Sequence, residues 1–382
     1  MKESNTILDV SVVLPTYNEA ENIPVIVPHI CETLSRAGLR GEVIIVDDNS
    51  PDKTAEIAKA LVGKYPVQVL VRTGERGLAT AVMAGFDISK AKACLVMDAD
   101  GSHPVEKLPD MIRPLLHDRA DITVGSRNIK GGSADKWPWH RRLISKTAAK
   151  MSFGLTRMTD PTSGFMGIQR HLLNGLELNP IGYKIVLEIV VKSAPERLVE
   201  IPITFRDREL GESKMSLKEQ WKYIRHLKRL YLYKFPTIWE LIRFSLVGLS
   251  GVFVDMAIVI GLKELFQLDT RLCAVFGFLV AVMTNYLLNR YWTFQQGRNM
   301  PFLKSCIMFV SVCCIGLMVR LLVMHLFIEY ARLDTGNWYM LTNFIGIMVA
   351  TAVNFSGSKY FAFSPERLAF QPKGSSQAQT RR

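Results

Sequence analysis

The sequence lacks the glycine-rich motifs of two widespread nucleotide-binding folds. No G-x-G-x-x-G follows the first apolar run, and no G-x-x-x-x-G-K-[ST] occurs anywhere in the 382 residues. These absences argue against a dinucleotide-binding dehydrogenase and against a P-loop enzyme. If this chain binds a nucleotide, a metal ion and cationic side chains must hold the phosphates.

The cysteines also lack the spacing of a metal site or a disulfide framework. The chain has six cysteines and no C-x-x-C pair, and Cys273, Cys306, Cys313 and Cys314 lie in apolar segments. This spacing indicates neither a zinc site nor a disulfide framework. We interpret the cysteines as packing residues.

The N-terminus shows no hydrophobic region of the signal-peptide kind. Its first apolar run, residues 10–14, is short and leads into Pro15. We therefore expect the N-terminal domain to stay in the cytosol.

Apolar residues are abundant, and positive charge is unevenly placed. The sequence is 48% hydrophobic with a net charge of +12, and its mean hydropathy is +0.14. These values are high for a wholly soluble protein, so part of the chain is expected to be membrane-embedded. Residues 214–243 carry eight Lys or Arg against two Glu, directly before the most apolar part. This placement favours anionic lipid headgroups over nucleic acid as partners.

The first 200 residues alternate between short apolar runs and amphipathic stretches. The strands predicted from this pattern are residues 10–14, 43–46, 67–71, 93–97 and 122–124. Alternation of this kind predicts an α/β domain with a mainly parallel sheet covered by helices. Ligands of such sheets bind beyond the carboxyl ends of the strands.

Polar side chains follow four of these predicted strands. They occupy residues 15–19, 47–50, 98–100 and 125–127. Asp98 and Asp100 are two apart on an extended tip, so their carboxylates point to the same side. A hard cation such as Mg²⁺ is often held by one or two carboxylates plus substrate phosphates. Because D-x-D also occurs by chance in loops, the metal interpretation depends on the convergence of all four strand ends.

Three later segments add polar groups. Residues 160–165 form a polar turn before an apolar run, and residues 183–191 are a predicted helix carrying Glu188. Residues 205–214 place three cations around Gly211, which fits a phosphate clamp, although a mobile surface loop would have the same composition.

Residues 216–235 form a predicted basic amphipathic helix. Trp221, Ile224 and Leu227 are among apolar residues at helical spacing, and Lys or Arg fills most other positions. Such a helix is expected to lie in the membrane interface. The alternative is a helix packed on the soluble domain.

Four apolar segments follow, at about 241–262, 272–294, 302–328 and 338–361. Each reaches the roughly 20 residues that span a bilayer. Lys and Arg concentrate in the second loop and the C-terminal tail, which places the soluble domain, this loop and the tail on the cytoplasmic side.

The apolar region contains an internal repeat. Residues 285–294 match residues 354–363, and Phe244, Gly251 and Asp255 align with Phe309, Gly316 and Arg320. The pattern predicts two copies of a helical hairpin. Because lone charges are costly in a membrane, we expect Asp255 and Arg320 to face the bundle interior, where they could pair.

With these motifs in hand, the chain resembles the polyprenyl-phosphate glycosyltransferases, and within them the dolichol-phosphate mannose synthases. The likeness covers residues 10 to about 220 and includes PTYNEAENI, VDDNSPDKT, MDADGSHP, GSR, DPTSGF and FRDRELGESK. Residues 241–363 look like the GtrA-like membrane proteins.

The resemblance implies a GT-A fold at residues 1–213, interfacial helices at 214–240, four transmembrane helices at 241–363 and a basic cytoplasmic tail at 364–382. It implies an integral, multi-pass enzyme that transfers mannose from GDP-mannose to a polyprenyl phosphate with inversion. A UDP-glucose or other UDP-sugar transferase, or lipid-linked sugar translocation by the membrane domain, stays open as an alternative. A processive polysaccharide synthase is disfavoured because Q-x-x-R-W is missing.

The resemblance also implies roles for individual residues. The nucleoside pocket would be lined by Pro15, Tyr17, Glu19, Val46 and Asp48. Asp98 and Asp100 would hold Mg²⁺ or Mn²⁺, and Ala99 would touch the donor.

Phosphates and the acceptor would be handled by a further set. Arg127, Arg208 and Lys214 would grip phosphates, and Ser163 would sit near the acceptor phosphate. The catalytic groups implied are therefore Asp98, Asp100, Arg127 and Ser163. Two departures stand out: Ser102 replaces a frequent Gln near the metal, and Ala79 replaces a frequent Gly.

Overall fold

The computed structural model describes residues 8–134, 137, 139–182, 184–206, 217–331 and 338–364. The chain divides into two compact units, Met1–Lys234 and Phe235–Arg382. Each is described by itself.

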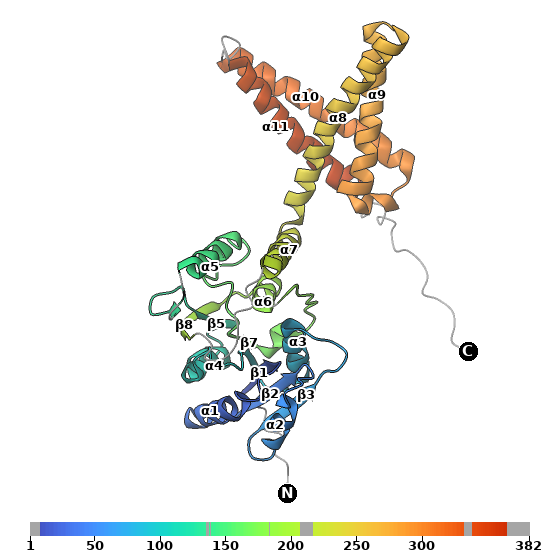
Figure 1. The fold of residues 1–382 in the computed structure, drawn as a ribbon. Helices are drawn as coiled ribbons and strands as arrows, with labels where there is room; N and C mark the ends of the chain where they lie inside the picture. Colours follow the sequence, from blue (N-terminus) through green and yellow to red (C-terminus); the bar gives the residue numbers. More distant parts are fainter. Residues whose placement is uncertain are drawn as a thin grey trace, which may run out of the picture. The chain divides into compact units, whose positions relative to one another are not determined.

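A seven-stranded sheet forms the centre of the first unit (Figure 1), in the order β3-β2-β1-β4-β7-β5-β8. Its strands are β1 (Val10–Thr16), β2 (Gly41–Asp47), β3 (Val67–Val71), β4 (Ala93–Val96), β5 (Ile122–Ser126), β7 (Met166–Gln169) and β8 (Leu198–Pro202). All neighbours pair in parallel except β7, which is antiparallel to both β4 and β5. The five predicted strands and the mainly parallel sheet are confirmed, whereas β7 and β8 were not foreseen.

Helices connect and cover these strands. They are α1 (Ile23–Arg36), α2 (Thr54–Ala60), α3 (Leu78–Ile88), α4 (Leu108–Leu116), α5 (Trp139–Met151), α6 (Ile185–Ser193) and α7 (Leu217–Lys234), with short 3₁₀ turns at Val105–Lys107 and Arg170–Leu173. Two short strands, β6 (Ser133–Ala134) and β9 (Thr204–Phe205), pair with each other. The helices predicted at 183–191 and 216–235 correspond to α6 and α7.

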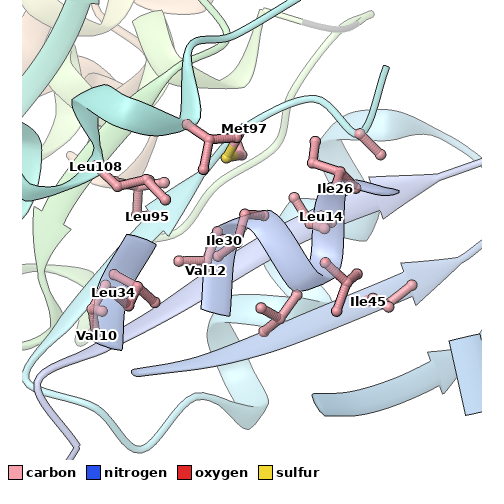
Figure 2. Close-up of a cluster of buried hydrophobic side chains, with 14 of the residues drawn as sticks. Val10, Val12, Leu14, Ile26, Ile30, Leu34, Ile45, Leu95, Met97 and Leu108 are labelled. Atoms are coloured by element: carbon pink, nitrogen blue, oxygen red, sulfur yellow. The ribbon is translucent and has the colours of Figure 1, made fainter. Parts of the chain in front are cut away.

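The main hydrophobic core lies on one face of the sheet. Alternate residues of β1, Val10, Val12 and Leu14, are fully buried and face a stripe of α1 that contains Ile26, Ile30 and Leu34 (Figure 2). The period of two in the strand and of about 3.6 in the helix produce these matching apolar faces. Helix α4 adds to the same cluster through Leu108 and Met111.

Helix α3 contacts β1 and β2, and the contact depends on Gly85. A Cβ added there would lie 3.2 Å from Val46 Cγ2 and closer still to Val13 Cγ1. Both valines are fully buried and β-branched, so neither can rotate away at low cost. The helix therefore approaches the strands at a distance that only glycine allows.

The second unit consists of two helical hairpins. The first is built from α8 (Pro236–Phe266) and α9 (Thr270–Leu288), and the second from α10 (Phe302–Ala331) and α11 (Trp338–Gly357). Helices α9 and α11 each continue into a π-helical turn, at Asn289–Thr293 and Ser358–Ala362; a 3₁₀ turn at Gln295–Asn299 follows the first. In the described residues, three helical segments are long and apolar enough to cross a membrane: Pro236–Phe266, Leu272–Thr293 and Phe302–Glu329. A membrane crossing by α11 stays a prediction.

Equivalent contacts confirm the internal repeat. Gly251 of α8 packs against Asn285 of α9, and Gly316 of α10 packs in the same way against Asn354 of α11. An aromatic cluster joins the hairpins, and in it the rings of Phe294 and Phe363 stack 5.3 Å apart.

The two predicted intramembrane charges lie against glycines of their own hairpins. Asp255 of α8 lies against Gly277 of α9, where an added Cβ would be 2.5 Å from Asp255 Oδ1. Arg320 of α10 lies against Gly346 of α11, where an added Cβ would be 3.2 Å from Arg320 Cγ. The ion pairs found among the described residues do not join Asp255 to Arg320. Pairing between these two side chains stays a prediction.

We expect Gly85→Ala to destabilise the first unit. Overpacking of a filled core costs about 1–3 kcal/mol, which exceeds the roughly 1 kcal/mol that the higher helix propensity of alanine returns. Thermal unfolding should therefore show a lower midpoint. Gly74→Ala is the control, because a Cβ at Gly74 meets no atom within 4 Å. Equal midpoints for the two variants would contradict the tight α3 contact.

Candidate functional site

The carboxyl ends of β1, β2, β4 and β5 meet at one edge of the sheet, as predicted from their polar tips. Because β7 runs in the opposite direction, residues 160–165 that precede it reach this edge too. The structure therefore brings residues 15–19, 47–50, 98–103, 125–127 and 160–165 to the same edge. Arg208 and Lys214 lie outside the described residues.

The tips of β1 and β2 are tied together by backbone and side-chain hydrogen bonds. Pro15 is the register partner of Val46, and the Glu19 amide donates to Thr54 Oγ1 over 3.0 Å. Val46 is fully buried, whereas Tyr17 is 40% exposed. The Arg76 guanidinium lies 5.3 Å from the centre of the Tyr17 ring. Tyr17 is thus partly exposed, with the Arg76 guanidinium over its ring, and its contact with a nucleoside stays a prediction.

The Asp48 carboxylate accepts hydrogen bonds from two other residues of the chain. Its Oδ1 accepts a hydrogen bond from Arg72 Nε at 2.8 Å, and its Oδ2 accepts one from the Gly77 amide at 2.7 Å. Asp48 therefore anchors the loop that leads into α3. A nucleoside contact through Asp48 stays a prediction.

Asp98 and Asp100 follow β4, and the chain around them is held by short-range hydrogen bonds. The Asp98 amide donates to His103 Nδ1 over 3.0 Å, and Asp100 Oδ1 accepts from the Ser102 amide at 3.0 Å and from the Ser102 hydroxyl. The Asp98 side chain is 26% exposed, and Ala99 between the two is buried. Ser102 thus orients Asp100.

His103 supports Asp98 from the protein interior. It is buried, stacks on Phe165 at 5.1 Å and meets the edge of Phe205 at 5.6 Å. Burial lowers the pKa of His103, and the nearby carboxylates Asp98 and Asp100 offset this only in part. A neutral imidazole agrees with Nδ1 acting as an acceptor. Sequence reasoning missed this residue, although it lies in the MDADGSHP motif.

A divalent cation fits the two carboxylates. Within the described residues no group of three or more His, Cys, Asp or Glu side chains could hold a metal by itself. Two carboxylates at an accessible strand end suit Mg²⁺ or Mn²⁺ whose other positions are filled by phosphate oxygens and water. The donor set therefore favours a metal that binds together with an anionic substrate.

Arg127 is fixed by a buried ion pair with Asp160. Its Nε and Nη2 donate to the two carboxylate oxygens over 2.7 and 2.6 Å, and Nη2 also donates to Thr162 Oγ1 over 2.8 Å. The guanidinium also lies 4.9 Å from the centre of the Trp137 ring. Burial alone would raise the pKa of Asp160, but the hydrogen bonds and charge of Arg127 outweigh it and lower the pKa. The pair is therefore ionised and rigid.

Ser163 is also held inside the protein. Its hydroxyl donates to the Gly125 carbonyl over 2.7 Å and accepts from the Phe165 amide at 3.2 Å. The neighbouring Gly164 lies against Asp98: a Cβ there would be 3.5 Å from Asp98 Oδ2. The Asp160–Phe165 turn thus touches both β5 and the Asp98 carboxylate that follows β4. A contact of Ser163 with the acceptor stays a prediction.

Asp160→Asn should lower the free energy of unfolding by about 3–5 kcal/mol at pH 7, because it leaves Arg127 buried without its anion. The folded protein lowers the pKa of Asp160, so this stabilisation is present above the unfolded pKa of about 4 and is lost as pH falls through the folded pKa. Denaturation at several pH values should show the gap between wild type and variant closing in acid.

Asp110→Asn is the matched control, because Asp110 pairs with Lys107 on the exposed surface at 3.0 Å. Its effect should stay below about 1 kcal/mol. A wild-type-to-Asp160→Asn gap that is constant from pH 7 to pH 3 would argue against an ionised Asp160.

Residues 11–176 match the family described as glycosyl transferase family 2, and residues 243–363 match the GtrA/DPMS transmembrane domain. A dolichol-phosphate mannosyltransferase from Pyrococcus furiosus is 36% identical over 352 residues, which is 91% of this chain and 97% of that protein.

Two further relatives match part of this chain. The dolichol-phosphate mannosyltransferase of Saccharomyces cerevisiae is 41% identical over 60% of this chain and 89% of its own length. The polyprenol monophosphomannose synthase of Mycolicibacterium smegmatis is 38% identical over 54% of this chain and 80% of its own length.

Proposed function

Because this chain belongs to the family-2 glycosyltransferases of the dolichol-phosphate mannosyltransferase type, with a GtrA/DPMS transmembrane domain, we propose that it transfers mannose from GDP-mannose to a polyprenyl phosphate. The products are polyprenyl-phosphate mannose, with an inverted anomeric centre, and GDP. The observation that carries the proposal is the near full-length match to the Pyrococcus furiosus protein. Asp98, Asp100 and Arg127, which lie at the same edge of the sheet, support it, and Arg127 is ion-paired to Asp160.

The acceptor needs little activation. A phosphate monoester carries about −1.5 to −2 charges near pH 7, so it is a nucleophile without a strong general base. The protein's part is to hold an acceptor oxygen in line with the anomeric carbon and to stabilise the leaving diphosphate. In-line attack from the face opposite the leaving group inverts the centre.

Each described group has a role in this arrangement. Asp98 and Asp100 would hold Mg²⁺ or Mn²⁺, which would supply positive charge to the diphosphate. His103 keeps the Asp98 backbone in place through its 3.0 Å hydrogen bond. Arg127, oriented by Asp160, directs cationic charge to a phosphate, and Tyr17 offers an aromatic face to the guanine base.

The protein is a membrane protein, and we extend the proposal to its topology. Helices α8 to α11 span the bilayer, with the first unit and the C-terminus in the cytoplasm. Helix α7 lies at the membrane surface: Leu227 and Leu230 are buried in the first unit, whereas Trp221 and Tyr233 are 62% and 56% exposed. An aromatic and basic outer face of this kind suits an interface with anionic lipid.

Asp98→Asn and Asp100→Asn should each lower kcat by about 10²- to 10³-fold, the scale seen when a group that stabilises transition-state charge is removed. Transfer of radiolabel from GDP-mannose to polyprenyl phosphate in detergent, with and without Mg²⁺ or Mn²⁺, measures this. Asp110→Asn, an exposed surface carboxylate, is the control and should keep wild-type activity.

The same assay separates the possible donors. Metal-dependent lipid label from GDP-mannose alone would support the whole proposal. Label from UDP-glucose alone would keep the reaction class and replace the donor, and near-normal activity of Asp98→Asn would contradict the metal role of this residue.

A further inference from the structure

Lys184 carries a positive charge where helix electrostatics disfavour one. It is the N-cap residue of α6, directly before Ile185. The positive end of the helix dipole lies here, and Ser, Thr, Asp or Asn is the usual N-cap. The Lys184 side chain is also half-buried, which adds a desolvation cost. A cation kept in such a place indicates a role other than helix stability.

The neighbours of Lys184 are groups of the candidate site. Its Nζ donates to the Thr162 carbonyl over 2.9 Å, and the hydroxyl of the same Thr162 accepts from Arg127 Nη2 at 2.8 Å. Lys184 and Arg127 are therefore attached to one residue of the Asp160–Phe165 turn. Burial, followed by the charge of Arg127, lowers the pKa of Lys184 to about 8 against the opposing charges of Asp160 and Asp98.

The acid in the first turn of α6 is engaged elsewhere. Glu188 is fully buried and accepts from the Asn179 amide at 2.9 Å, from Lys192 Nζ at 2.8 Å and from Arg229 Nη2 at 3.2 Å. Glu188 thus ties α6 to Arg229 of α7.

The backbone before Lys184 is braced by α7. The Ile181 amide donates to His226 Nδ1 over 3.4 Å. A Cβ added to Gly182, whose φ of +75° favours glycine, would lie 3.4 Å from Glu219 Oε2. Both contacts come from α7, so Ile181 and Gly182 lie against that helix.

Charge balance favours a second cation on this turn. The proposed reaction brings two anions together, the acceptor phosphate and the leaving diphosphate, and a divalent cation held by Asp98 and Asp100 would supply positive charge to the diphosphate. The charge of Arg127 is largely balanced by Asp160. We propose that Lys184 is a further acceptor-binding residue, whose ammonium, held on the Thr162 carbonyl beside Arg127, helps bind the phosphate of the polyprenyl phosphate. This inference rests on the proposed transfer to that lipid.

The test compares Lys184→Gln with Lys184→Arg. A glutamine amide can still donate to Thr162 but carries no charge, so KM for polyprenyl phosphate should rise about tenfold, the scale of one charge-assisted hydrogen bond. Lys184→Arg should return KM to within about threefold of wild type, because the charge is kept. KM for the nucleotide sugar should change by less than about twofold in both variants. A purely structural role would not produce this split.

Lys192→Gln is the matched control from the same helix. Lys192 is a half-buried lysine that pairs with Glu188 and donates to the Glu177 carbonyl. Its loss should lower the thermal midpoint and leave both KM values unchanged. An unchanged lipid KM in Lys184→Gln, or a rise in the nucleotide-sugar KM instead, would overturn the inference.

If Lys184→Gln does not fold, chemical labelling of the wild-type protein tests the same proposal. Farnesyl phosphate should slow reductive methylation of Lys184 severalfold, read by mass spectrometry, and leave Lys192 unaffected. Equal labelling of Lys184 with and without farnesyl phosphate would overturn the proposal. Loss of the proposed function is distinguishable, because it would appear as absent transfer by the wild-type enzyme itself.

Discussion

Strand β7 runs against its two neighbours, and this reversal assembles the site. A parallel strand at the same place would begin at the opposite edge of the sheet. Because β7 is antiparallel to β4 and β5, the Asp160–Phe165 turn arrives where those strands end. Ser163 then reaches the Gly125 carbonyl, and Gly164 lies against Asp98. All four residues of β7 are buried, so a register slip of one residue would exchange the packing of both faces.

The buried pair of Arg127 and Asp160 serves orientation more than stability. Burial of two charges carries a desolvation cost that mutual attraction only roughly repays. The pair is nevertheless supported by Thr162 and by the ring of Trp137. These partners fix a planar guanidinium before any substrate arrives, which reduces the entropy lost when a phosphate binds. Preorganisation of this kind is what a reaction with an already anionic nucleophile needs most.

The two helical hairpins of the second unit share a geometry but differ in their polar contacts. Arg290 and Lys359 hold equivalent places in the two π-helical turns. Arg290 is buried and donates to Tyr286 Oη over 3.1 Å, to Ser305 Oγ and to the Met300 carbonyl, both over 2.5 Å. Lys359 instead forms an ion pair with Glu240 at 2.7 Å. Repetition explains the shared helix geometry, and divergence at equivalent positions gives each hairpin its own polar contacts.

The sequence by itself determined the parts that depend on local pattern. Strand periodicity and polar strand ends were sufficient for β1 to β5, the parallel sheet and the placing of Asp98, Asp100 and Arg127 at its edge. The length and hydropathy of the C-terminal segments indicated membrane helices, and residue matches revealed the repeat. These features come from neighbours in the chain, so they are visible without a fold.

Only the tertiary structure decided which distant groups meet. Strand β7 is four residues long, too short for a periodic signal, and its direction depends on pairing across more than 40 residues with β5 and at least 70 with β4. That pairing brings Asp160 beside Arg127 and Gly164 against Asp98. The spacing of these residues in the sequence does not predict this pairing, because the packing of the whole sheet determines which remote segments form hydrogen bonds.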